Sequence, residues 1–142
     1  MSILPDTSPA VRMGRFCWVD LATGDPLAAT SFYGTLFGWH AREHRIGRGR
    51  FSTLAKDGAP FASVYRLTGE QIERGVPSLW MPYVSVPDVD AAATRAGALG
   101  GEVMVDCQYV EGFARICVIA DPTGALIGLW QAESESSKPR SR

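Results

Sequence analysis

The chain has 142 residues and a mass of 15.4 kDa, which is the size of one globular domain. Hydrophobic residues make up 46% and charged residues 20%, a composition that excludes a wholly disordered chain. The net charge of -1 leaves no basic surplus for nucleic-acid binding, and no apolar run reaches the ~20 residues of a membrane helix. The N-terminus lacks a signal-peptide pattern, and the three cysteines show no CxxC spacing and fit reduced thiols. We therefore expect a cytoplasmic protein with no nucleic-acid or membrane partner.

The first half of the chain predicts one strand, one helix and three further strands. After a flexible segment over residues 1–13, an apolar run at 16–21 indicates a strand. Asp25 can cap a helix over 27–37, because its carboxylate can accept hydrogen bonds from the free N–H groups of the first turn. Gly38 suits the left-handed position after that helix. The three strands that follow are expected at 39–46, 50–56 and 61–67.

The same order of signals returns in the second half. A strand candidate at 81–86 precedes Asp88, which can cap a helix over 89–99, and Gly101 maps onto Gly38 as the stop signal. The last three strands are expected at 102–109, 114–120 and 125–131. The chain therefore predicts a single domain over 14–131. Its parts are a βαβββ module over about 14–68, a polar linker over 68–78, a second module over about 78–131 and a disordered tail over 132–142.

Three short motifs carry a resemblance to a known family. They are Asp25 with Phe32, Tyr33 and Gly38 at fixed spacing, the AGALGG run that ends at Gly101, and the DPTG turn that leads into the last strand. Because the three motifs occur in this order and at this spacing, the chain resembles the vicinal oxygen chelate superfamily. This superfamily includes glyoxalase I, bleomycin-resistance proteins and extradiol dioxygenases. Its WVDL opening strand and DPTGA ending resemble a metal-free subgroup of glyoxalase-like proteins. The resemblance implies an α+β fold in which two βαβββ modules form a curled mixed sheet around a cleft, and it implies a homodimer.

The resemblance also implies where a divalent metal ion would bind in metal-dependent relatives. Its ligand positions, on the first and last strands of each module, fall here on Trp18, about Ser63, Met81 and Gly128. Tryptophan, serine, methionine and glycine at these positions do not together make a site for a hard divalent ion. The only histidines, His40 and His44, lie on a predicted strand and would be roughly 13 Å apart, too far for one ion. We therefore expect no metal ion and no other cofactor.

Strand alternation predicts which side chains line the cleft with those four positions. The predicted lining is mostly aromatic and apolar, and it consists of Trp18, Asp20, Phe61, Ser63, Tyr65, Met81, Tyr83, Gly128 and Trp130. Such a lining suits a flat organic ligand. The alternative is that these aromatic side chains simply fill a packed barrel.

Two functions follow from this lining. The first is metal-independent binding of a small hydrophobic or aromatic molecule, for sequestration or carriage, as the resemblance to bleomycin-resistance proteins implies. The second is a cofactor-independent or substrate-assisted enzyme of secondary metabolism, in which Asp20 is the catalytic acid or base. Arg115, on the penultimate strand, is a candidate partner for Asp20. A metal-dependent lyase or dioxygenase would require the four transferred positions to be wrong.

Overall fold

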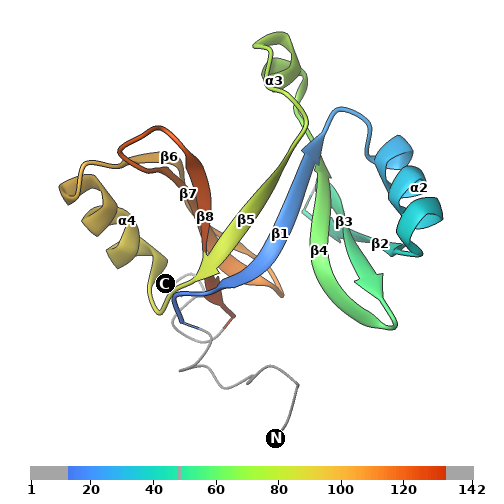
Figure 1. Ribbon diagram of the computed structural model, residues 1–142, viewed down its shortest axis with the longest axis horizontal. Coiled ribbons are helices and arrows are strands. Elements are labelled where there is room, and N and C mark those ends of the chain that lie inside the picture. The colour runs from blue at the N-terminus through green and yellow to red at the C-terminus, as the bar shows by residue number, and fades with distance from the viewer. Residues whose placement is uncertain (1–12, 48, 134–142) are drawn as a thin grey trace, which may run out of the picture. The chain divides into compact units, whose positions relative to one another are not determined.

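The computed structural model describes residues 13–47 and 49–133. The expected flexible segment 1–13 and the expected tail 132–142 lie outside these residues, apart from Met13, Ala132 and Glu133. The described residues form eight strands and three helices, and they divide into two compact units. One unit is residues 18–81, and the other contains residues 13–17 and 82–133 of the described chain. The predicted α+β fold of two βαβββ modules is confirmed (Figure 1).

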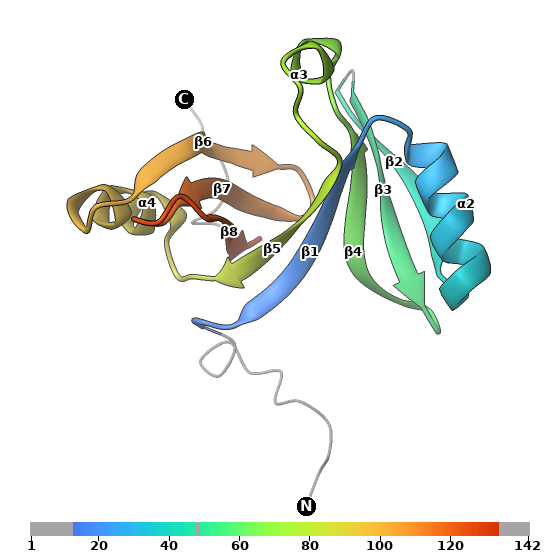
Figure 2. The same cartoon turned by 45° about the horizontal axis from the view of Figure 1, so that its top comes forward.

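The first module is a four-stranded mixed sheet with one helix on one of its faces (Figures 1 and 2). Its strand order is β2-β3-β4-β1, in which β1 runs parallel to β4 and the other neighbours are antiparallel. In chain order the elements are β1 (Phe16–Thr23), α2 (Pro26–Phe37), β2 (His40–Ile46), β3 (Gly49–Lys56) and β4 (Ala59–Arg66). Its core lies between α2 and the sheet and is built on Leu21, Leu54, Ala62 and Val64, with Ala29 and Tyr33 of α2 packed against them.

Local signals place α2 as the sequence predicts. Asp25 Oδ1 accepts a hydrogen bond from the N–H of Ala28 at 3.0 Å, and Pro26 occupies the first turn, where its missing N–H costs nothing. The helix ends at Gly38, whose φ of 75° is a left-handed conformation that favours glycine. The helix therefore begins after Asp25 and ends before Gly38, as these two signals predict.

The second module repeats this arrangement with the strand order β5-β8-β7-β6. Its elements are β5 (Leu79–Ser85), α4 (Val89–Ala98), β6 (Glu102–Val110), β7 (Ala114–Ala120) and β8 (Leu126–Ala132). Asp88 caps α4 as predicted, with Oδ1 3.0 Å from the N–H of Ala91. The left-handed residue after α4 is Gly100 (φ 94°) and not Gly101, because this helix ends one residue earlier than expected. Its core contains Val89, Ala93, Cys117 and Leu129.

The segment between the modules is predicted to be a polar linker, but in the structure it contains a short helix. This helix, α3 (Gly69–Glu73), begins with a reciprocal cap. The N–H of Gln71 donates to Thr68 Oγ1 at 3.1 Å, and the N–H of Thr68 donates to Gln71 Oε1 at 2.8 Å. No helix within the described residues is long and apolar enough to cross a membrane.

The boundary of the first compact unit also differs from the expected residue 14. Residues before Trp18 belong to the second unit, because the N–H of Gly14 donates to the carbonyl of Ser85 at 2.7 Å. The N–H of Ser85 in turn donates to the carbonyl of Arg15 at 2.9 Å. The residues just before β1 therefore pair with Ser85 at the end of β5, which places them in the second unit.

Candidate functional site

A chain of hydrogen bonds joins three of the predicted site residues in the first module. Trp18 Nε1 donates to Ser63 Oγ at 2.9 Å, and Ser63 Oγ donates to Asp20 Oδ1 at 2.8 Å. Asp20 and Ser63 are direct partners on the parallel strands β1 and β4. Their neighbours Val19, Leu21 and Val64 pack under α2, so alternation points these polar side chains to the opposite side of the sheet. We call this sheet surface, with Trp18, Asp20, Ser63 and Tyr65, the Asp20 face.

Asp20 is only 8% exposed, which is unusual for a carboxylate. Its hydrogen bond to Ser63 supplies part of what the carboxylate loses when it leaves water. Because Trp18 donates to the same hydroxyl, the Ser63 proton is directed toward Asp20. The sequence predicts these three residues on one face, and the structure joins them through specific atoms.

Tyr65 lies on β4 two positions beyond Ser63, and its side chain is 36% exposed. Burial and the neighbouring Asp20 carboxylate both raise the pKa of Tyr65 above its ordinary value. A tyrosine with a raised pKa stays protonated at neutral pH, so its hydroxyl can donate a hydrogen bond. Tyr65 therefore adds a donor to the Asp20 face beside the buried carboxylate.

The Asp20 face extends over the other two strands to residues that the sequence analysis did not assign to the site. Thr53 on β3 is the direct partner of Ser63, and His44 on β2 contacts Thr53 Oγ1 through Nε2 at 2.9 Å. The His44 ring stacks on Phe51, which is the direct partner of Tyr65. His44 and His40 lie on a strand, as predicted, but spacing within one strand does not reveal the cross-strand partner of His44. Only the register of β2, β3 and β4 does so.

The equivalent positions in the second module hold an aromatic pair. Tyr83 and Gly128 are direct partners on the parallel strands β5 and β8, as Asp20 and Ser63 are on β1 and β4. The Tyr83 ring covers Gly128 so closely that a Cβ added there would lie 2.6 Å from Tyr83 Cγ. Trp130 meets the same ring edge-on, with 6.0 Å between ring centroids. Tyr83 is only 3% exposed, so its ring fills the interior of the second module. For this residue, the structure agrees with the alternative that the aromatic side chains fill a packed barrel.

Phe61 is not brought to the Asp20 face. Its ring packs edge-on against Trp39, with 4.7 Å between centroids, and it contacts the core under α2. The register of β3 and β4 shifts between Leu54 and Ala55, so alternation counted back from Ser63 fails at Phe61. Met81 is buried at 9% exposure. Trp80 donates through Nε1 to Tyr33 Oη at 3.1 Å and packs against the core under α2.

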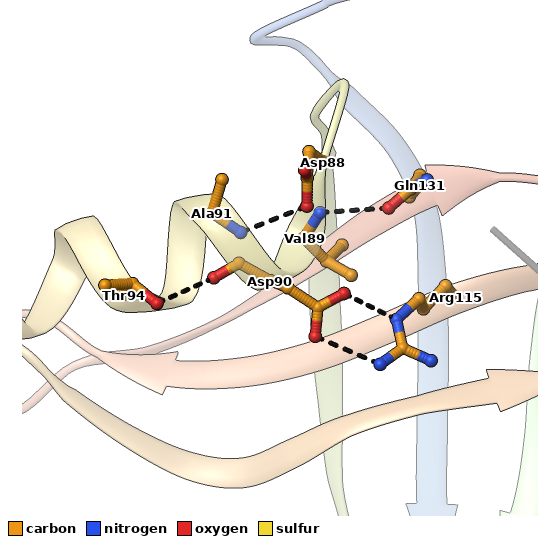
Figure 3. Close-up of polar contacts among 7 residues, drawn as sticks. All are labelled: Asp88, Val89, Asp90, Ala91, Thr94, Arg115 and Gln131. Atoms are coloured by element: carbon orange, nitrogen blue, oxygen red, sulfur yellow. Dashed lines mark hydrogen bonds and ion pairs between the residues drawn. The ribbon is translucent and has the colours of Figure 1, made fainter. Parts of the chain in front are cut away.

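Arg115 does not serve as the partner expected for Asp20. Its guanidinium forms a two-pronged ion pair with Asp90 of α4, at 2.8 Å from Nε to Oδ2 and 3.0 Å from Nη2 to Oδ1 (Figure 3). This hydrogen bonding lowers the pKa of Asp90. At the same end of α4, Gln131 Oε1 accepts the N–H of Val89 at 3.0 Å (Figure 3). Arg115 therefore links β7 to α4. The sequence alone did not show to which face of β7 the Arg115 side chain points.

The four positions transferred from metal-dependent relatives do not fit a divalent ion. The Trp18 indole is already donating to Ser63, and an indole N–H offers no lone pair to a metal. Met81 has a soft thioether, and Gly128 has no side chain and lies under the Tyr83 ring. Within residues 13–47 and 49–133, no three His, Cys, Asp or Glu side chains are grouped so that they could hold a metal ion.

Two βαβββ modules, each a mixed sheet with one parallel strand pair and a helix on one face, define the vicinal oxygen chelate class of proteins. Within this class, residues 18–129 match the family model described as the glyoxalase-like domain. The chain therefore belongs to the glyoxalase-like domain family.

Several known proteins and structures resemble this chain. A *Mycobacterium bovis* protein provisionally named glyoxylase CFP32 is 38% identical over 123 residues, which cover 85% of this chain and 47% of that protein. The anthracycline biosynthesis protein DnrV of *Streptomyces peucetius* is 34% identical over 132 residues, with 83% and 47% covered. The chain thus spans about half the length of these curated relatives. Methylmalonyl-CoA epimerase of *Mycobacterium tuberculosis* shares the fold at 21% identity and a TM-score of 0.63, over 94% of this chain and 96% of that one.

Proposed function

We propose that the chain binds a small aromatic or hydrophobic molecule on the Asp20 face without a metal ion. The single observation that carries this proposal is the hydrogen-bond chain from Trp18 through Ser63 to Asp20. It sets a buried carboxylate and a polarised hydroxyl between aromatic side chains. A flat ligand would stack on Trp18 and Tyr65, and a hydroxyl group on that ligand would hydrogen-bond to Ser63 or Tyr65.

The chemistry of one relative supports an aromatic ligand. DnrV is named for anthracycline biosynthesis, and anthracyclines are flat, hydroxylated polycyclic molecules. The residues at the four transferred positions support binding without a metal, because Trp18, Met81 and Gly128 offer no ligand for a hard divalent ion and the Ser63 hydroxyl already bonds to Trp18 and Asp20. The ligand would then be held by stacking and hydrogen bonds alone.

The test is titration of the protein with 1,4-dihydroxyanthraquinone, followed by quenching of tryptophan fluorescence in the presence of EDTA. We expect saturable quenching, and weaker binding of unsubstituted anthraquinone, which lacks the hydroxyl groups. Ser63→Ala and Tyr65→Phe should each weaken binding about tenfold, which corresponds to the loss of one hydrogen bond worth ~1.4 kcal/mol.

Tyr109→Phe is the matched control. The Tyr109 hydroxyl bonds to Glu133 in the second module, so removing it should leave the affinity unchanged. Loss of binding in EDTA would overturn metal independence. Equal affinities in Ser63→Ala, Tyr65→Phe and the wild type would overturn the Asp20 face as the binding site.

A second candidate function is catalysis without a cofactor, with Asp20 as the general base. The burial of the Asp20 carboxylate favours it, because a base shielded from water can take a proton directly from a bound molecule. The mycobacterial relative provisionally named as a glyoxylase also supports an enzyme. Asp20→Asn should then abolish turnover of any substrate found and leave its affinity within about threefold. An unchanged rate in Asp20→Asn would reject this role.

A further inference from the structure

Three arginines lie side by side across the sheet of the first module. Arg45 on β2 is the direct partner of Arg50 on β3. Phe51 on β3 is the direct partner of Tyr65 on β4, and one step further along these antiparallel strands Arg50 lies beside Arg66. We call these three residues the arginine row. Because like charges on directly opposed residues repel, the row costs stability unless an anion binds to it.

The arginine row lies on the helix-covered side of the sheet, opposite to the Asp20 face. Val64 belongs to the core under α2, and Arg66 follows it by two positions on β4. Leu54 belongs to the same core, and Arg50 lies four positions before it on β3. Side chains two or four positions apart on a strand point to the same side of the sheet. A ligand on the arginine row would therefore lie across the sheet from a ligand on the Asp20 face.

A cavity of about 770 Å³ is lined by the arginine row and by the first turn of α2. Arg50 and Arg66 line it from the sheet, and Leu27 lines it from the helix. Its volume is in the range of known small-molecule pockets. Leu27 is 80% exposed, and the buried Val64 adds apolar surface to the same lining. Tyr65 is the one lining residue that also belongs to the Asp20 face. The cavity thus combines guanidinium groups with apolar side chains.

The carboxylates near the cavity do not neutralise the arginine row. Glu43 Oε1 lies 3.7 Å from Arg50 Nη1, and because the two side chains are 57% and 65% exposed, this ion pair contributes little. Asp25 also lines the cavity, but its Oδ1 already accepts an N–H of the first turn of α2. Neither Arg45 nor Arg66 forms an ion pair with a carboxylate of residues 13–47 and 49–133. Three guanidinium groups beside the Glu43 carboxylate leave two positive charges on the row.

We propose that this cavity binds a phosphate monoester, with the phosphate at Arg50 and Arg66 and the apolar part of the ester against Leu27. A phosphate monoester carries nearly two negative charges at neutral pH, which matches the charge left on the arginine row. Arginine holds phosphate oxygens through two parallel N–H donors, and it stays charged in proteins. Ser52 lines the same cavity and supplies a hydroxyl donor. The bound phosphate would also relieve the repulsion within the row.

The first test is isothermal titration calorimetry with n-hexyl phosphate, which has no ring to stack on Trp18 of the Asp20 face. We expect one molecule to bind per chain. 1-Hexanol lacks the phosphate and should bind at least about tenfold more weakly. Heptanoate has a chain of similar length but a single charge, and its affinity should lie between the other two. No binding of n-hexyl phosphate, or equally tight binding of 1-hexanol or heptanoate, would overturn the proposal.

Variants of the cavity then locate the site. Arg66→Met should weaken binding of n-hexyl phosphate about tenfold, and Arg50→Met should weaken it further, because Glu43 then faces the phosphate without its partner. Glu43→Gln should instead tighten binding about threefold, since it frees Arg50, and loss of the fold could not produce such a gain.

Arg95→Met is the matched control for these variants. It removes an exposed arginine of α4 in the second module and should leave the affinity for n-hexyl phosphate unchanged. Equal affinities in Arg66→Met and Arg95→Met, or no tightening in Glu43→Gln, would overturn the proposal.

Discussion

The ring of Tyr83 lies directly over the backbone of Gly128. The two residues are partners on parallel strands, and Tyr83 is 3% exposed, so the ring is shielded from solvent by its neighbours. This contact occupies the position where metal-dependent relatives would place a ligand side chain. At these positions the second module therefore has a packed aromatic ring, whereas the first module has the polar side chains of Asp20 and Ser63.

Gly128→Ala should therefore destabilise the protein by about 2–3 kcal/mol, because the added Cβ has to displace the Tyr83 ring. The free energy of unfolding from urea denaturation measures this effect. Gly97→Ala is the control, since a Cβ at Gly97 in α4 meets no atom within 4 Å and alanine favours a helix. If Gly128→Ala were as stable as Gly97→Ala, the close contact between Tyr83 and Gly128 would be wrong.

The ionisation of Tyr65 should report directly on Asp20. Because the Asp20 carboxylate disfavours the tyrosinate, Asp20→Asn should lower the pKa of Tyr65 toward its ordinary value. Alkaline titration of the tyrosinate absorbance measures this change, and Tyr65→Phe identifies the transition among the four tyrosines. If the pKa of Tyr65 were the same in Asp20→Asn and in the wild type, the Asp20 carboxylate would not be a cause of the raised pKa.

The same shift has a consequence for stability at high pH. The folded state holds the Tyr65 proton more tightly than the unfolded state, whose tyrosine pKa is about 10. The stabilisation is complete below that unfolded pKa, and it is lost as the pH rises through the folded pKa. Wild type should therefore lose more stability above about pH 10 than Tyr65→Phe does. Parallel losses in the two proteins would contradict the raised pKa.

The ion pair between Asp90 and Arg115 should couple α4 to β7 weakly and in a salt-dependent way. A double-mutant cycle with Asp90→Asn and Arg115→Met should give a coupling energy of about 0.5–1 kcal/mol, because the Asp90 side chain is 57% exposed. The pKa of Asp90 is lowered in the folded state, so this stabilisation is present above the unfolded pKa of about 3.9. It should disappear as the pH falls through the folded pKa of Asp90. A coupling of zero at low salt would rule out a stabilising role.

The three cysteines should differ sharply in reactivity. Cys17 is exposed, whereas burial, with a smaller contribution from its hydrogen bond to Cys117, raises the pKa of Cys107 to about 12. Such a shift leaves Cys107 with about a thousandfold less thiolate than an ordinary thiol. A thiol-specific reagent at about pH 8 should therefore label Cys17 quickly, and Cys107 and Cys117 only after unfolding. Rapid labelling that persists in Cys17→Ser would contradict this order.

Signals between neighbouring residues were sufficient to predict most of the fold. Both caps, Asp25 and Asp88, lie where expected, and the predicted strand at 114–120 coincides with β7. The three-residue spacing of Thr68 and Gln71 marks the start of α3, although the sequence analysis predicts only a polar linker over 68–78. Capping and periodicity act over three or four residues, so they can be read without the tertiary structure.

The site depended on contacts that no local pattern contains. Alternation placed Trp18, Asp20, Ser63 and Tyr65 on one face, but the pairing of Ser63 with Asp20, and of His44 with Thr53, follows from strand register. Phe61 was misplaced because one register shift reverses the alternation beyond it.

The sequence by itself determined two βαβββ modules, their caps and the polar and aromatic residues available to a site. Only the tertiary structure decided that Asp20 meets Ser63 and that Arg115 meets Asp90. The physical reason is that these partners are far apart in the chain. Their meeting depends on how whole strands and helices pack, and that packing is set by the sum of many contacts.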